Sequence, residues 1–260
     1  MNVKRRILAF MGMVAMSMAV LLWPAQVAMA GGGVIETGAC TDASSCINNS
    51  GIIKSGACQG LSSCNNNTKI IKENACSGAN LESCNENGGV IKQGACASPL
   101  SCSGNFGVIG KSSCGEGGLG IYSCTGNTGK IGAESCNGGS MACVDNAGKI
   151  GKESCIGAGA CNMNNGRIDN GSCTGLNSCQ NNMGWIKRGS CNGDNACNGN
   201  VGIIAAFQCN ADTACPDNVK GSKKHHKKQR HDTHSHGKKD DHHKWWKKDD
   251  HHKWWKKDAD

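Results

Sequence analysis

A fixed repeat runs through most of this chain and limits the folds that it can adopt. Each unit contains an isoleucine, a first cysteine five residues later, a second cysteine, and an asparagine three residues after that. The next first cysteine always lies twelve positions after a second cysteine, whereas the two cysteines of a unit lie six to ten positions apart. Insertions are therefore confined to one place, which is typical of a stacked repeat with a loop on its outside.

Four positions recur in ten units. The isoleucines are Ile35, Ile53, Ile71, Ile91, Ile109, Ile131, Ile150, Ile168, Ile186 and Ile204. The first cysteines are Cys40, Cys58, Cys76, Cys96, Cys114, Cys136, Cys155, Cys173, Cys191 and Cys209. The second cysteines are Cys46, Cys64, Cys84, Cys102, Cys124, Cys143, Cys161, Cys179, Cys197 and Cys215. The asparagines are Asn49, Asn67, Asn87, Asn105, Asn127, Asn146, Asn164, Asn182, Asn200 and Asn218.

The unit predicts one coil of a β-solenoid. Glycine opposes helix by about 1 kcal/mol per position, and the chain has 38 glycines. Short strand-compatible pieces alternate with glycine turns, and three sides of roughly six residues would point the isoleucine and both cysteines inward. We therefore expect an all-β fold over residues 31–218, a parallel β-helix of ten coils of about 18 residues.

The asparagine column predicts a ladder of buried side-chain amides. An amide at a turn can bond its own backbone and also the identical amide one coil away. Glycine follows two residues later in most units and would supply either a positive φ or close approach of the backbone at that corner. These glycines are Gly51, Gly89, Gly107, Gly129, Gly148, Gly166, Gly184 and Gly202, and Lys69 and Lys220 replace them in two units.

Residues 1–30 have the layout of a secretory signal peptide. A basic start (Lys4–Arg6) precedes an apolar run (Ile7–Trp23) and the small-residue end Ala28-Met29-Ala30, after which cleavage is expected. The alternative is a retained membrane anchor, for which the apolar run is short. We predict an exported protein, extracellular or at the cell surface, with the periplasm as a further destination.

Export makes a disulfide framework the first interpretation of the cysteines. We expect each first cysteine to pair with the second of its own unit, Cys58 with Cys64 for example. Each bond would contribute about 2–2.5 kcal/mol. Pairing between adjacent coils also fits disulfide geometry. No Cys-x-x-Cys occurs and the repeats contain no histidine, which argues against zinc ligation. A store of reduced cysteines for soft metals is a less favoured alternative.

Two cysteines six residues apart in short, stacked coils resemble the disulfide-stapled β-solenoids of beetle antifreeze proteins over residues 33–217. The resemblance implies the architecture of the fold. The threonine columns that form the ice face of that family have no counterpart, because Thr37, Thr68, Thr125, Thr128 and Thr174 are scattered. A weaker similarity is to the curlin repeats of extracellular amyloid, which are also exported and rich in Gly and Asn but lack paired cysteines.

The repeats offer no catalytic constellation. Residues 31–217 carry 11 basic and 13 acidic residues in no regular column, and no histidine that could activate a serine. We therefore predict no enzyme activity and no required cofactor. Four lysines share the position after the isoleucine but are interrupted by glycine and aspartate, so we interpret them as solvated rather than as a stripe for an anionic polymer. They are Lys54, Lys72, Lys92 and Lys187.

Residues 219–260 form a low-complexity basic tail that we expect to be disordered, and residues 218–260 carry 14 basic and 7 acidic residues. Its histidines can bind Cu, Ni or Zn, or the tail is simply a solubilising polycation. They are His225, His226, His231, His234, His236, His242, His243, His251 and His252. Tryptophan pairs flanked by lysine suit a membrane interface or an anionic cell-surface polymer. They are Trp245, Trp246, Trp254 and Trp255.

An open coil at the start of the repeats would present unpaired backbone groups, which motivates end-to-end self-association. We do not expect nucleic acid as a partner of an exported chain. The sequence thus predicts an exported, non-enzymatic structural protein of a surface, matrix or filament, attached through its tail. The alternatives are a metal-binding protein acting through the tail and an ice-binding solenoid.

Overall fold

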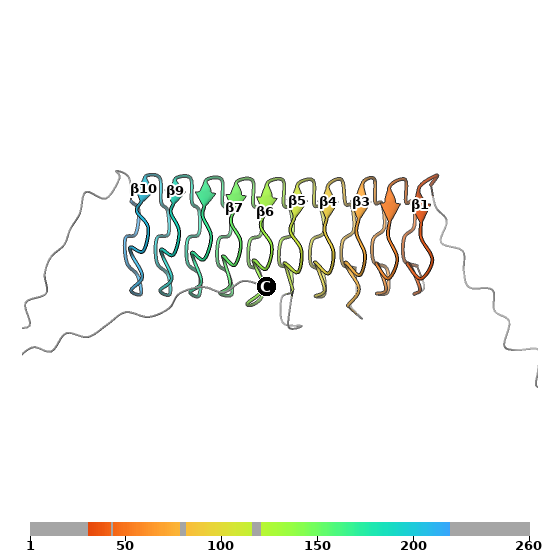
Figure 1. The fold of residues 1–260 in the computed structure, drawn as a ribbon, viewed down its shortest axis with the longest axis horizontal. Helices are drawn as coiled ribbons and strands as arrows, with labels where there is room; N and C mark the ends of the chain where they lie inside the picture. The colour runs from red at the N-terminus through yellow and green to blue at the C-terminus, as the bar shows by residue number, and fades with distance from the viewer. Residues whose placement is uncertain (1–30, 43, 79–81, 116–120, 219–260) are drawn as a thin grey trace, which may run out of the picture. The chain divides into compact units, whose positions relative to one another are not determined.

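The computed structural model describes residues 31–42, 44–78, 82–115 and 121–218. They form a parallel β-solenoid whose coils stack in a row (Figure 1). The predicted signal peptide (1–30) and tail (219–260), with its histidines and tryptophans, lie outside the described residues.

Each coil contributes one short strand to a ten-stranded parallel sheet in chain order. The strands are β1 (Val34–Ile35), β2 (Ile52–Ile53), β3 (Ile70–Ile71), β4 (Val90–Ile91), β5 (Val108–Ile109), β6 (Lys130–Ile131), β7 (Lys149–Ile150), β8 (Arg167–Ile168), β9 (Trp185–Ile186) and β10 (Ile203–Ile204). Isoleucine faces isoleucine in the ladder, as Ile53 faces Ile71. We number the coils after their strands; coil 2, for example, spans residues 51–68.

Only one of the three predicted sides is a strand, and the other two are turns. The reason lies in the backbone at the cysteines: in both columns every cysteine has a positive φ, for example 59° at Cys58 and 57° at Cys64. Left-handed residues cannot continue a strand. The inward placement of the isoleucine and cysteine columns is nevertheless as predicted, because their interior members are buried.

Backbone hydrogen bonds join neighbouring coils on the turn sides as well as along the sheet. The N–H groups of Lys54, Cys58 and Cys64 donate to carbonyls of coil 3, at 2.9–3.0 Å. In the opposite direction, the N–H groups of Asn74 and Glu82 in coil 3 donate to carbonyls of coil 2, at 3.2 and 3.0 Å. This alternation gives each coil a ring of donors and acceptors toward both neighbours.

All ten disulfides join the two cysteines of one coil, so the within-coil alternative is the one that the structure has. The insertions fall between bonded cysteines. The Cα atoms of Cys114 and Cys124, ten residues apart, lie 5.8 Å from each other, the same distance as those of Cys58 and Cys64, six apart. The bond therefore closes the neck of a longer loop without disturbing the stack.

The asparagine column forms the predicted ladder. From Asn67 to Asn200, each Nδ2 donates to the Oδ1 of the preceding coil at 2.7–2.8 Å and also to a carbonyl of its own turn, as Asn67 does to Asn49 and to Lys69. Asn218 Nδ2 continues the ladder to Asn200 at 2.9 Å. The glycine two residues later is needed for close approach: a Cβ on Gly51 would lie 2.1 Å from the carbonyl oxygen of Lys69. Where Lys69 replaces glycine, the ladder bond from Ile70 N–H to Gly89 lengthens to 3.4 Å, against 2.8 Å one coil earlier.

The residue directly before the first cysteine, in the inner wall of the solenoid, changes along the stack. In coils 1–4 it is alanine, whose N–H donates to a carbonyl of the same coil, as Ala57 does to Lys54 at 3.2 Å. In coils 5–9 it is a buried serine: Ser113, Ser135, Ser154, Ser172 and Ser190. Ser154 Oγ donates to the carbonyl of Asp169 in the next coil at 3.1 Å and accepts from the N–H of Ser172 at 3.4 Å. Coils 5–9 therefore contain a serine ladder that the sequence analysis did not predict.

Candidate functional site

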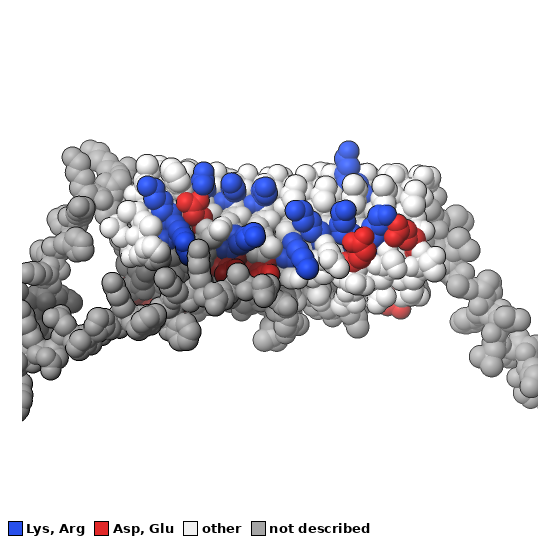
Figure 2. Space-filling view, in the orientation of Figure 1, with Lys and Arg blue, Asp and Glu red and all other residues white. Residues whose placement is uncertain are grey.

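The outward residues of the strands form one column along the sheet, and its chemistry changes halfway. This strand-outer column consists of Val34, Ile52, Ile70, Val90, Val108, Lys130, Lys149, Arg167, Trp185 and Ile203. It is apolar through coil 5, cationic in coils 6–8 and aromatic in coil 9. Because the strands pair in register, Lys130 lies beside Lys149, Lys149 beside Arg167, and Arg167 beside Trp185. Figure 2 shows Lys and Arg side chains in a row along this part of the rod.

Beside the cationic part of the column lies a hollow of about 300 Å³, which we call the basic hollow. It is lined by Lys149, Gly151, Arg167, Ile168, Asp169, Asn170 and Arg188. Gly151 keeps it open, since this position carries a lysine in coils 2–4. A Cβ on Gly151 would lie 2.5 Å from Asn170 Oδ1, which itself accepts a hydrogen bond from the N–H of Lys152 at 2.9 Å. Lysine would not fit here without a shift of the next coil.

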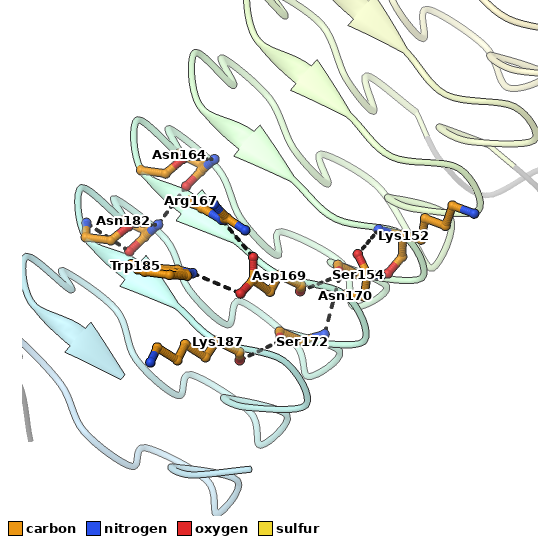
Figure 3. A network of polar contacts seen from close by, with 12 residues as sticks. Lys152, Ser154, Asn164, Arg167, Asp169, Asn170, Ser172, Asn182, Trp185 and Lys187 are labelled. Carbon is orange, nitrogen blue, oxygen red and sulfur yellow. Dashed lines mark hydrogen bonds and ion pairs between the residues drawn. The ribbon is translucent and has the colours of Figure 1, made fainter. Parts of the chain in front are cut away.

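The carboxylate of Asp169 contacts both Arg167 and Trp185 beside the hollow (Figure 3). Asp169 accepts from Arg167 Nε at 2.8 Å through Oδ1 and from Trp185 Nε1 at 2.9 Å through Oδ2. The indole ring of Trp185 also lies 4.6 Å from the guanidinium carbon of Arg167 and 5.1 Å from Lys187 Nζ. Both distances are within the range of cation–π attraction. The contacts link neighbouring coils and fix the Arg167 and Trp185 side chains in one arrangement.

The basic hollow has an excess of positive charge. Lys149, Arg167 and Arg188 line it, against the single carboxylate of Asp169, both of whose oxygens accept hydrogen bonds. A guanidinium fork binds carboxylate, sulfate and phosphate groups well. The arrangement is therefore suited to bind anions, and the described residues around it include no histidine or free thiol for acid–base or nucleophilic chemistry.

The cysteines offer no metal site within the described part of the chain. Sulfur atoms of neighbouring coils come within 4.8 Å of one another, as in the group Cys58, Cys64 and Cys76. All of these sulfurs are in disulfides, whereas metals are held by thiolates. The column of sulfur is therefore structural.

The two ends of the stack carry complementary unpaired groups. At the first coil, the carbonyls of Ile35 and Ala39 accept no hydrogen bond from another described backbone group; at the last, the N–H groups of Ala205 and Cys209 donate none. Their interior equivalents are paired, as Cys58 N–H is with the carbonyl of Ala75 at 3.0 Å. Ile35 and Cys40 in the first coil, and Cys209 and Cys215 in the last, are only partly buried, whereas their interior equivalents are fully buried.

A surface ion pair joins the first two coils. Glu36 accepts from Lys54 Nζ and, through its other oxygen, from the N–H of Ser55 at 3.1 Å. The hydrogen bond from Lys54 is the main cause that lowers the pKa of the Glu36 carboxyl, and the bond from Ser55 adds to it. The same contact raises the pKa of Lys54.

The predicted site residues have different outcomes. The structure bonds the cysteines in pairs and so accounts for the disulfide set. The tail histidines and tryptophans lie outside the described residues, and their roles stay predictions. Of the lysine column, Lys54 pairs with Glu36 and Lys187 lies beside Trp185, while Lys72 and Lys92 are exposed.

Sequence reasoning missed the basic hollow and the serine ladder. The signal for the hollow is present one position earlier than the lysines that we considered. Lys130, Lys149 and Arg167 each stand directly before the repeat isoleucine in three successive units.

These features define a disulfide-rich β-solenoid repeat protein. A family model described as a domain of unknown function (DUF7640) matches residues 116–186 and, in a second overlapping placement, residues 138–227. Overlapping placements are expected for a repeat, since one unit resembles the next. No curated protein and no solved structure matches the chain.

The many disulfides favour an oxidising, extracellular environment. None of the described residues forms a helix of the length and apolarity needed to cross a membrane. The disulfide-rich solenoid repeat is consistent with a structural role.

Proposed function

We propose that this chain is an exported, non-enzymatic structural protein whose rods join head to tail in a surface or matrix filament. The observation that carries the proposal is the complementarity of the two ends. The last coil presents the N–H groups of Ala205 and Cys209 where interior coils donate to their successors, and the first coil presents the carbonyls of Ile35 and Ala39 where interior coils accept. A second copy placed on the last coil would continue the existing ladder.

The match extends to individual groups. In such a stack Ala205 N–H would face the carbonyl of Ile35 of the next copy, as Lys54 N–H faces that of Ile71 at 2.9 Å. Asn218 Oδ1 would accept from Asn49 Nδ2, as Asn49 Oδ1 accepts from Asn67 at 2.8 Å. Each contact has the same geometry as one inside the rod.

Two residues that replace the usual ones at the junction also agree with head-to-tail stacking. Asn65 Oδ1 accepts from the N–H of Ile47 at 2.8 Å, and several coils repeat this amide cap. In the last coil this donor position is Pro216, which has no N–H, and in the first coil the acceptor position is Ile47, which has no side-chain amide. Neither group would be left unsatisfied where the two coils meet.

A head-to-tail contact of this kind does not close on itself, because the surface used at one end differs from that at the other. Heterologous contacts along a common axis generate open filaments. Sheet edges that are not covered are ready templates for another chain. The rod would therefore grow along its own axis.

The experiment is sedimentation and negative-stain electron microscopy of the full chain without residues 1–30. We expect filaments or a concentration-dependent series of oligomers. Both terminal coils carry acidic residues, Glu36 and Asp42 in one and Asp212 and Asp217 in the other. Added salt should therefore strengthen association by screening their repulsion.

Ala205→Pro removes one junction donor that has no described partner, and it should weaken association. Ala206→Ser, an exposed and uncharged change in the same coil, is the matched control. Circular dichroism shows whether each variant keeps the fold. A wild-type chain that remains monomeric at every concentration and salt level would overturn the proposal.

The tail is proposed as the attachment device. Its paired histidines suit Cu, Ni or Zn, and its Lys-flanked tryptophans suit an anionic cell-surface polymer or a membrane interface. Calorimetric titration of the full chain with copper, beside a variant with all nine histidines changed to alanine, tests the metal. Equal heats from the two proteins would remove metal binding from the tail.

A further inference from the structure

We propose that the basic hollow and the cation column that leads into it bind an acidic polysaccharide, a linear polymer with a carboxylate or sulfate on its repeating sugars. This site is separate from the rod ends and from the tail. The proposal does not depend on whether the rods form filaments.

The charge of the site selects an anion. Lys149, Arg167 and Arg188 surround the hollow. Asp169 is ion-paired with Arg167 and so offsets only one of the three positive charges; its two oxygens accept from Arg167 Nε at 2.8 Å and from Trp185 Nε1 at 2.9 Å. The Asp169 carboxylate is thus a positioning group: it holds Arg167 through Nε, and the terminal guanidinium nitrogens are the part of the fork that matches a carboxylate or sulfate.

The linear arrangement of the cations favours a polymeric ligand over a single small anion. Lys130, Lys149 and Arg167 occupy one register position on successive strands, so they follow the rod axis at about 4.8 Å per coil. One charged sugar of an extended polysaccharide spans about the same length as one coil. Successive anionic groups of the polymer can therefore meet successive cations, which a single small anion cannot do.

The aromatic residue fits a sugar better than a bare inorganic anion. Trp185 ends the cation column, is half-buried, and is held by Asp169 and by the neighbouring cations at 4.6 and 5.1 Å. An indole combines apolar area with a polar edge, and a sugar ring likewise combines apolar C–H faces with hydroxyl groups. The predicted export of the chain places it where such polymers occur and away from nucleic acid.

The test is calorimetric titration of the full chain without residues 1–30 at low salt. The probes are an oligogalacturonate, a sulfated oligosaccharide of similar length and a neutral oligosaccharide. We expect one or both acidic probes to bind, the neutral one not to bind, and binding to weaken as salt is raised. The two acidic probes distinguish carboxylate from sulfate as the recognised group.

The double variant Arg167→Gln, Arg188→Gln should weaken binding about tenfold. The matched control Lys72→Gln, Lys92→Gln removes the same charge from exposed residues of coils 3 and 4, and we expect less than about a threefold change. Trp185→Leu should weaken binding by about threefold without changing the net charge.

Equal losses in the hollow variant and in the control would place the attraction in the diffuse charge of the chain or its tail and would overturn the proposal. So would equally tight, hollow-dependent binding of single-stranded DNA or of anionic lipid vesicles. Circular dichroism of each variant confirms that the fold is retained. Filament formation should be unaffected by the hollow variants, so failure here is distinct from failure of the proposed assembly.

Discussion

Coils 1–4 and coils 5–9 have the same isoleucine, cysteine and asparagine columns, but they differ in the residues between them. The first group has alanine beside the first cysteine and an apolar strand-outer column. The second group has a serine ladder, and from coil 6 its strand-outer column is cationic and then aromatic. The four fixed columns therefore determine the stack, while the remaining positions are free to determine what a given part of the surface can bind.

The hollow shows how the two kinds of position interact. Gly151, which lines the hollow, stands directly after the repeat isoleucine. This sequence position carries lysine in coils 2–4 and glycine in coils 5–7. At Gly132 a Cβ would lie 2.5 Å from the backbone of Gly151, so coils 5–7 cannot accept the lysines of coils 2–4 without a shift of the next coil, whereas coil 9 carries Lys187 there again. A change in the inner wall thus coincides with a change in the outer surface.

Removal of a disulfide should have the largest effect and should be equal in the two groups. The double variants Cys96→Ser, Cys102→Ser in coil 4 and Cys155→Ser, Cys161→Ser in coil 7 each open a ring with a separation of six residues. Each should lower the free energy of unfolding by about 2–3 kcal/mol. Denaturant unfolding measures both. A much smaller loss in coil 7 would show that the serine ladder supports its group independently.

Loss of a ladder asparagine should rank second and should also be alike in both groups. Asn146→Ala removes the bond to Asn127 Oδ1 and the acceptor for Asn164 Nδ2, each at 2.8 Å. Because the partners are buried, the free energy of unfolding should fall by about 1–3 kcal/mol. Asn67→Ala tests the first group in the same way.

Asn165→Ala is the matched control for the asparagine ladder, since Asn165 is exposed one residue after the ladder position. Its effect should stay within about 0.5 kcal/mol. A control as costly as Asn146→Ala would mean that the turn, and not the ladder, is the source of stability.

The serine ladder should give a smaller effect that separates the two groups. Ser154→Ala removes an Oγ that donates to Asp169 at 3.1 Å and accepts from Ser172 at 3.4 Å, at a cost of about 1 kcal/mol. The reverse change, Ala75→Ser, adds a buried hydroxyl to a wall built without one and should also destabilise. If Ala75→Ser stabilises the protein, the two groups do not differ in the way described.

The pH dependence of the Glu36–Lys54 pair should give the smallest effect. The pKa of Glu36 is lowered in the folded chain from its ordinary value of 4.5. The pair therefore adds stability above that value, and this contribution is lost as the pH falls through the lower, folded pKa. The melting temperature of the wild type should exceed that of Glu36→Gln slightly at neutral pH, and the difference should vanish in acid. A difference that grows in acid would contradict the assignment.

Most of the fold could be predicted from the sequence because its period is carried by residues with one strong role. The isoleucines and cysteines had to point inward, and the asparagines had to satisfy their amides, so the solenoid and the amide ladder followed. The left-handed backbone at the cysteines could not be predicted, because L-residues rarely adopt it outside glycine and asparagine. It is not confined to the disulfides either, since Ser62 and Glu86 adopt it at 56° and 57°.

The basic hollow could not be predicted for a different reason. Its residues come from three coils and meet only because the coils stack in register. Lys149 and Arg167 each stand directly before an isoleucine in successive coils, whereas Arg188, in the next coil, stands two positions after one. The contact of Asp169 with Trp185 joins residues 16 positions apart. Columns on the outside tolerate many residue types, so their pattern becomes informative only once the coils are aligned.

The most direct test of the stacked-coil account is a disulfide map of the purified protein, obtained by protease digestion and mass spectrometry without reduction. The account predicts ten bonds, each between the two cysteines of one coil, as between Cys136 and Cys143. Bonds between cysteines of different coils, or a substantial fraction of free thiol, would contradict it.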